Sequence, residues 1–139
     1  MYDRILVATD GSESAAAAVR RAIDLADQYD ATLHAVFVVD TRLHGEPAFS
    51  SVELLVEEIE DRGHRLLGEI VDTAEDRGID VVARCCHGVP HEEILAHADE
   101  VDADLLVLGY KGETHLTSEH IGSVAERVVR FATRPVLLS

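Results

Sequence analysis

Three glycines near the C-terminal end of the sequence have the chemistry that is easiest to interpret. Gly109 and Gly112 are separated by two residues, and Gly122-Ser123 follows after nine more. Glycine accepts positive φ and lets another group come close to the backbone. The first N–H groups of a helix have no intrahelical acceptor and lie at the positive end of the helix dipole. Glycines at the beginning of a helix therefore predict a phosphate site, the alternative being a tight turn.

The segments on either side of these glycines predict the elements that would position them. The apolar run over 104–108 ends at the first glycine and is typical of a buried strand. The spacing of apolar residues then predicts a helix over 123–133, with Val124, Val128 and Phe131 on one face. Phosphate would thus bind between the end of a strand and the beginning of a helix.

The rest of the chain alternates between strand-like and helix-like patterns. Alternation of this kind predicts an α/β fold of one domain, residues 1–139, with a parallel five-stranded sheet covered by helices on both faces. The expected strands are 3–8, 31–39, 79–85, 103–108 and 135–138, and the expected helices are 13–28, 52–77, 91–100 and 123–133.

A polar segment and a long helix lie between the second and third expected strands. Residues 40–51 show no periodicity and predict a loop, for which a lid is one interpretation. In the helix over 52–77, Gly63 and Gly68 each cost about 1 kcal/mol relative to alanine, and a kink near Gly63 is one outcome. The apolar face of this helix is expected to hold Leu55, Ile59, Leu66, Ile70 and Ala74.

The spacing G-x2-G-x9-G-S resembles the nucleotide-binding pattern of the universal stress protein family. Residues 5–12 are similar to the first strand and turn of that family, 88–94 to its third strand–helix junction, and 134–138 to its closing strand. The resemblance therefore covers the whole chain in order. It implies a doubly wound fold like that of the adenine-nucleotide α-hydrolases, with strand order 3-2-1-4-5. Ligands of such sheets bind where the strand order reverses, here between strands one and four.

This placement brings the end of strand one to the same crevice as the glycine-rich segment. The resemblance implies that Asp10 lies beside the nucleotide and that the main chain of Val38 contacts the adenine. A turn-capping role is the alternative for Asp10, and a solvated loop position is the alternative for Lys111. The candidate cofactor-binding residues are Ala8, Thr9, Asp10, Val38, Gly109, Lys111, Gly112, Gly122, Ser123 and Val124.

The expected function is an ATP-binding regulatory protein, and the resemblance implies a role in stress response. A divalent cation, Mg²⁺ or Mn²⁺, would be carried on the phosphates, so no protein-built metal site is expected. The sequence has neither a G-x4-G-K-[ST] loop nor a G-x-S-x-G motif, and no catalytic residue is identified. Binding with at most weak hydrolysis is therefore expected. The alternatives are a slow ATPase or phosphoryl or nucleotidyl transferase, and an interaction module without nucleotide.

Composition narrows the set of partners. The net charge is −15, and 11 of the 12 basic residues are arginine. Such an acidic surface disfavours nucleic acid and anionic membranes, and it suits a salty cytoplasm because salt screens the self-repulsion. No apolar run approaches the roughly 18 residues of a membrane span, and no leader is apparent, so we expect the cytoplasm.

The remaining chemically notable residues favour structural interpretations. Cys85 and Cys86 are neighbours in an expected strand and would point to opposite faces, so we expect core packing, with a redox role as the alternative. His115 and His120 flank the glycine loop and are expected to be solvated, with contact to the ligand as the alternative. The apolar segment 135–138 would form an edge strand, and the resemblance implies a homodimer joined through it.

Overall fold

The computed structural model describes residues 2–41, 49–111 and 122–139, and it confirms the alternation of strands and helices. The strands are β1 (Arg4–Ala8), β2 (Thr32–Asp40), β3 (Val81–Gly88), β4 (Leu105–Leu108) and β5 (Val136–Leu138). The helices are α1 (Glu13–Tyr29), α2 (Phe49–Asp76), α3 (Pro90–Val101) and α4 (Ser123–Phe131).

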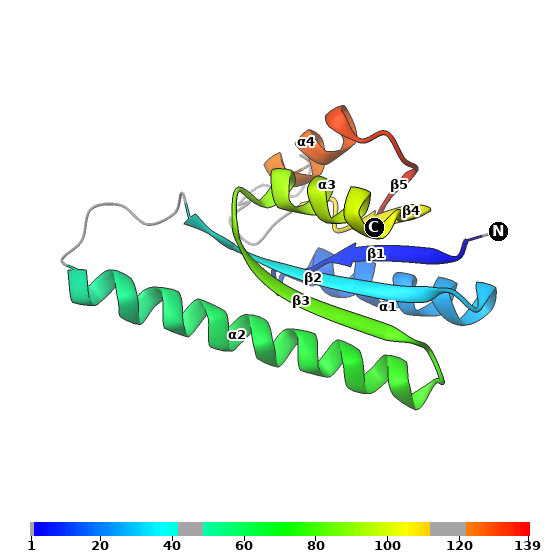
Figure 1. Ribbon diagram of the computed structural model, residues 1–139, viewed down its shortest axis with the longest axis horizontal. Helices are drawn as coiled ribbons and strands as arrows, with labels where there is room; N and C mark the ends of the chain where they lie inside the picture. Colours follow the sequence, from blue (N-terminus) through cyan, green and yellow to red (C-terminus); the bar gives the residue numbers. More distant parts are fainter. Residues whose placement is uncertain (1, 42–48, 112–121) are drawn as a thin grey trace.

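The sheet is parallel throughout, and its strand order is β3-β2-β1-β4-β5, so the expected order 3-2-1-4-5 is confirmed (Figure 1). In register, Ile5 of β1 pairs with Leu33 of β2 on one side and with Leu105 of β4 on the other. The strands β2 and β3 lie on one side of β1, and β4 and β5 lie on the other. The strand order therefore reverses between β1 and β4. Both strands end at the same edge of the sheet, where a ligand site is expected.

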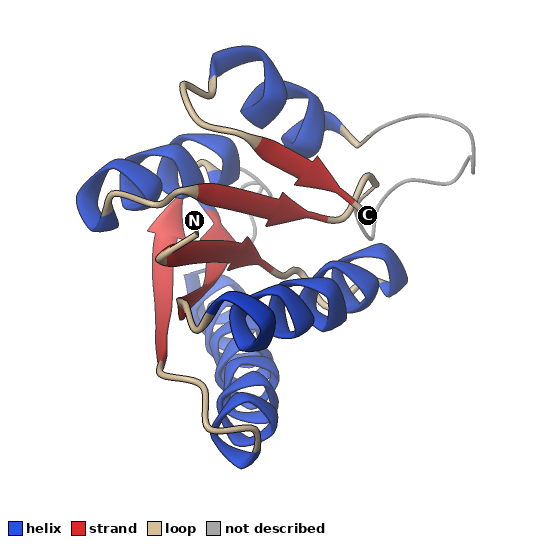
Figure 2. Ribbon diagram, turned by 90° about the vertical axis from the view of Figure 1, so that its right-hand side faces the viewer, coloured by secondary structure: helices blue, strands red, loops and turns tan. Residues whose placement is uncertain are grey.

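Helices cover both faces of the sheet, α1 and α2 on one and α3 and α4 on the other (Figures 1 and 2). Alternating residues of each strand belong to the two core layers, one on each face of the sheet, since successive side chains of a strand point to opposite faces. In β1, Ile5 and Val7 pack with α1 and α2, whereas Leu6 packs against α3 and α4. Because the inner strands are buried on both faces, their sequences are continuous apolar runs.

The second helix begins earlier than the sequence predicted. α2 starts at Phe49, so positions 49–51 of the expected loop are helical, while 42–48, where a lid was one interpretation, lie outside the described residues. Leu55 was expected on the buried face but is 41% exposed. The reason is length: 28 helical residues span about 42 Å, and the first turns extend beyond the sheet (Figure 1).

The buried face of the last helix also differs from the prediction. Ala125 and Val128 are its buried residues, whereas Phe131, predicted to share the core face, is 59% exposed. Phe131 is the final residue of α4, and its ring stacks on His91 of α3 with 6.3 Å between ring centroids. One side of the ring is therefore covered and the other faces outward.

The two cysteines point to opposite faces of β3, as predicted. Cys85 packs against the layer of α1 and α2, and Cys86 against the layer of α3 and α4. Burial, with a smaller contribution from Glu60 and Glu93 respectively, raises the pKa of both thiols. Both therefore remain protonated at neutral pH, which favours the packing interpretation over the redox one.

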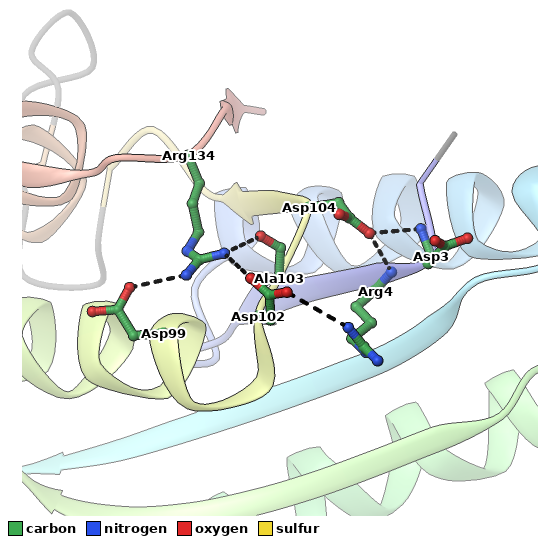
Figure 3. A network of polar contacts seen from close by, with 7 residues as sticks. All are labelled: Asp3, Arg4, Asp99, Asp102, Ala103, Asp104 and Arg134. Carbon is green, nitrogen blue, oxygen red and sulfur yellow. Dashed lines mark hydrogen bonds and ion pairs between the residues drawn. The ribbon is translucent and has the colours of Figure 1, made fainter.

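Polar contacts hold the amino ends of the strands together, opposite the edge where ligands are expected (Figure 3). The Asp104 carboxylate accepts hydrogen bonds from the N–H groups of Asp3 (2.7 Å) and Arg4 (2.9 Å). Arg134, just before β5, donates to Asp99 and Asp102 at 3.1 and 3.0 Å. These contacts tie β1, β4, β5 and α3 into one frame. None of the described helices is long and apolar enough to cross a membrane.

Candidate functional site

A cavity of about 290 Å³ lies at the carboxyl ends of β1, β2 and β4, beside the first turn of α4. This is the edge where the strand order reverses. The lining residues are Ala8, Thr9, Asp10, Ser12, Ala15, Val36, Phe37, Val38, Asp40, Ile59, Arg62, Pro90, Ile94, Leu108, Gly109, Lys111, Ser123, Val124 and Ala125.

Most of the residues predicted from the sequence line this one cavity. The structure brings together Ala8, Thr9, Asp10, Val38, Gly109, Lys111, Ser123 and Val124. Gly122 is buried and precedes the lining residues of α4 without lining the cavity itself. Gly112 lies outside the described residues, as do His115 and His120.

The turn after β1 is organised by its own side chains. The Thr9 hydroxyl accepts a hydrogen bond from the N–H of Gly11 at 3.2 Å, and Asp10 Oδ1 accepts one from the N–H of Ser12 at 2.9 Å. Ser12 in turn caps α1 by accepting from the N–H of Ala15. The turn-capping alternative for Asp10 is therefore present, and the same residue lines the cavity.

Gly109 is required by a contact within the protein. A Cβ at this position would lie 2.5 Å from the Ser14 hydroxyl oxygen and 2.7 Å from the Ala15 backbone nitrogen. The first turn of α1 therefore packs directly on the chain leaving β4. The Ser14 hydroxyl also donates a hydrogen bond to the carbonyl of Lys111. These contacts hold the exit of β4 beside the beginning of α1.

The N–H of Gly122 is already used inside the protein. It donates to the carbonyl of Tyr110 at 2.5 Å, and the N–H of Tyr110 donates to the carbonyl of Ser139 at 3.0 Å. This corrects the expectation that the amide of Gly122 is available to a ligand. The same bond brings the beginning of α4 next to the exit of β4, which is the arrangement that the glycine spacing predicted.

The next three N–H groups, at positions 123, 124 and 125, belong to the first turn of α4, and the residues that carry them line the cavity. Helix geometry gives these groups no intrahelical acceptor. Gly122 occupies the N-cap position and has no side chain that could accept from them. Within the described part of the chain, no other acceptor reaches them. The positive end of the α4 dipole therefore faces the cavity, which suits an anion.

Lys111 is held at the cavity by a neighbouring ring. Its ammonium lies 5.3 Å from the centroid of the Tyr110 ring, within the range of a cation–π contact. The positive charge therefore remains near the exit of β4 and the first turn of α4, where it would add to the attraction for an anion.

Two charged residues of the cavity were missed from the sequence: Arg62 of α2 and Asp40 at the end of β2. A signal for Arg62 was available, because it lies three residues after Ile59 and four before Leu66 on the face of α2 that packs on the sheet. A charge at a core-facing position of an amphipathic helix is uncommon without a partner or a cavity. Among residues 2–41, 49–111 and 122–139, no group of three His, Cys, Asp or Glu side chains is placed to hold a metal ion.

The fold and the cavity define a doubly wound α/β protein with a cavity at its topological switch point, where the ligands of such sheets bind. The family model of the universal stress protein family matches residues 1–139. The chain therefore belongs to the universal stress protein family.

Relatives and solved structures agree with this assignment. A universal stress protein from Methanocaldococcus jannaschii is 38% identical over 99% of this chain and 82% of its own. The structure of UspA from Lactobacillus plantarum has a TM-score of 0.90 at 26% identity, with 99% of this chain and 97% of that one covered. A universal stress protein solved in complex with cAMP has a TM-score of 0.75 at 30% identity, with 99% and 97% covered.

Proposed function

We propose that this protein binds an adenine nucleotide, ATP with Mg²⁺ or Mn²⁺ on its phosphates, in the cavity between β1, β4 and the beginning of α4. The observation that carries the proposal is the first turn of α4, whose residues 123–125 line the cavity and whose three N–H groups have no acceptor in the described residues. Lys111 adds a positive charge on the same side. Together these groups suit a polyphosphate.

The rest of the cavity suits the nucleoside. Val36 and Val38 of β2, with Ile94 of α3 and Leu108 of β4, give it an apolar wall on which a base can pack. Small-molecule sites typically combine such a wall with a few well-placed polar groups. The solved relative in complex with cAMP supports an adenine nucleotide as the ligand class, since it shares the fold at 30% identity.

Binding without rapid turnover is the proposed mode of action. The groups described above attract the ground-state nucleotide, and interactions of equal strength in the ground and transition states do not accelerate a reaction. The protein would then act as a cytoplasmic regulator in stress response, with the bound nucleotide stabilising one conformation or assembly.

The proposed assembly is a homodimer joined through β5. This strand pairs with β4 on one side and forms the edge of the sheet on the other, and its three residues are only half-buried. Phe131 and Val129, both exposed at the end of α4, add apolar surface close to it in the sequence. Exposed strand edges of this kind are usually paired or covered, and we propose that a second copy of the chain does so here.

Calorimetric titration of the protein with ATP and Mg²⁺ tests the proposed function. We expect saturable heat with one site per chain, and a higher melting temperature when ATP is present. Ligand at 100 times its Kd stabilises a native state by about 2.7 kcal/mol, which is readily measured. Absence of both heat and thermal shift at millimolar ATP would refute nucleotide binding.

A further inference from the structure

The α2 side of the cavity holds charged groups that the phosphate-binding turn does not explain. Asp10 follows β1, Asp40 ends β2, and Arg62 reaches the cavity from the middle of α2. The charges sum to −1, so an additional anionic group is disfavoured here. The inference drawn from these residues rests on the nucleotide-binding function proposed above. It concerns the part of the nucleotide that they recognise.

Gly11 makes room for the Arg62 guanidinium, and Gly63 allows the helix that carries Arg62 to lie close to β2. A Cβ on Gly11 would lie 2.9 Å from Cζ of Arg62, so the guanidinium packs directly on the backbone of the turn after Asp10. Gly11 also has φ of +86°, which side-chain-bearing residues rarely adopt. On α2, a Cβ on Gly63 would lie 2.5 Å from the Phe37 ring, so this glycine lets the helix approach β2 closely. The position of the guanidinium is therefore built into both elements.

The distance from the phosphate-binding turn assigns this side to the nucleoside. α2 packs on the face of the sheet opposite α4. The end of β2 is two strands away from β4, which corresponds to about 10 Å. Arg62 packs on the turn after β1, the strand between β2 and β4. A nucleotide with its phosphates at α4 and Lys111 and its base on Val38 would therefore place its sugar at Arg62. Ile59, one turn before Arg62, gives this end an apolar surface beside its charges.

The chemistry of the three side chains selects a hydroxyl-rich group. A guanidinium only donates hydrogen bonds, and an ionised carboxylate only accepts them. A hydroxyl does both, so two adjacent hydroxyls can accept from Arg62 while they donate to Asp10 and Asp40. We propose that Arg62 is a specificity-determining residue that reads the 2′,3′-diol of the ribose, so that the cavity prefers ribonucleotides.

The test compares ATP with 2′,3′-dideoxy-ATP in the wild type and in Arg62→Met, by calorimetric titration with Mg²⁺ present. A hydrogen bond to a charged group corresponds to about tenfold to 100-fold in affinity. We expect the wild type to bind ATP at least about tenfold more tightly than the dideoxy analogue. In Arg62→Met, affinity for ATP should fall by a similar factor while affinity for the analogue is unchanged.

Arg65→Met is the matched control, because it removes the same charge from an exposed position of α2 three residues later. It should leave both affinities at the wild-type values. Arg62→Lys retains the charge without the planar fork, so it should lose part of the preference for ATP. If Arg62→Met fails to fold, the Arg62→Lys variant still tests whether Arg62 determines the preference for ATP.

Three results would overturn the inference while nucleotide binding stands: a wild type that binds both ligands equally, an Arg62→Met variant that loses affinity for both alike, or one that keeps its preference for ATP. A wild type that binds neither ligand would overturn the proposed function as well.

Discussion

Ser123 lines the cavity and carries two hydrogen-bond donors, its backbone N–H and its hydroxyl. We propose that the N–H has the larger role in binding phosphate. The two can be separated by substitution. Proline is tolerated at the first position of a helix, and the preceding Gly122 has φ of −67° and ψ of 153°, a conformation compatible with a following proline.

We predict that Ser123→Pro, which removes both donors, weakens ATP binding by about tenfold to 100-fold, because a charge-assisted hydrogen bond is lost. Ser123→Ala removes only the hydroxyl and should have a smaller effect. Titration of both variants, with circular dichroism to verify the fold, provides the measurement. Equal affinities for the two variants would contradict a phosphate-binding role of the backbone amide.

His34 of β2 is a second residue with a measurable consequence. Burial, then the neighbouring His97 and Arg4, lower its pKa from 6.5. His97 is itself buried and contacts Arg84 and Glu100. Below pH 6.5 the unfolded state therefore binds a proton at His34 more readily than the native state does, so stability falls as the pH falls through the lowered pKa.

We predict that the melting temperature of the wild type decreases between pH 7 and pH 5 by more than that of His34→Gln, which lacks the titrating group. Subtracting the two curves removes the titration of the carboxylates, which both proteins share. A difference that is independent of pH over this range would count against the lowered pKa.

At the residue scale, the glycine spacing indicated Gly109 and Gly122, and the family resemblance indicated Asp10, whose carboxylate also organises its own turn. The reasons were partly different from those expected: Gly109 is needed for contact with α1, and the amide of Gly122 bonds to Tyr110. Arg62 was not found, since its place at the cavity depends on how α2 packs against β2. The spacing of Ile59 and Leu66 places Arg62 on the core-facing side of α2, but it does not show that this side meets the cavity.

Among the elements, α2 offers the clearest contrast between two residues of the same type. Gly68 is exposed, and a Cβ there would meet nothing within 4 Å, whereas Gly63 is buried against the Phe37 ring. The sequence treated both glycines alike, as weaknesses of one helix. The structure shows that only Gly63 has a packing reason, and α2 continues through it as one helix.

We predict that Gly68→Ala stabilises the protein by about 1 kcal/mol, through helix propensity alone. Gly63→Ala should destabilise it by about 1–3 kcal/mol, because the new methyl group overpacks against Phe37. Urea unfolding of the two variants measures both changes. Two variants that shift in the same direction would show that Gly63 has no packing role.

The largest differences between predicted and observed boundaries were three residues: α2 begins at 49 rather than 52, and β3 continues to 88 rather than 85. α1 and the inner strands agreed within about two residues, since burial on the sheet imposes their periodicity. At the beginning of α2 and the end of α4, the exposed Leu55 and Phe131 were wrongly assigned to the core. An apolar residue in a regular helical pattern does not reveal where the covering layer ends.

For the whole molecule, the fold class and strand order could be predicted, because alternating strands and helices leave few right-handed topologies and the family resemblance selects one. The net charge of −15 is also a property of the whole chain. Its self-repulsion destabilises the compact state at low ionic strength. At about 1 M salt the Debye length is about 3 Å, so most of this repulsion is screened.

We predict that the thermal midpoint rises steeply from low salt to about 1 M KCl and then levels off, since screening saturates near that concentration. A rise that remained linear to multimolar KCl would indicate a general salt effect on burial instead. A midpoint that is unchanged between low and multimolar KCl would contradict adaptation to a salty cytoplasm.

The most direct test of the central claim is a crystal structure of the protein grown with ATP and Mg²⁺. We predict phosphate oxygens within hydrogen-bond distance of the N–H groups at 123–125, with the adenine against Val38. Nucleotide bound elsewhere, or phosphates turned away from the first turn of α4, would contradict it.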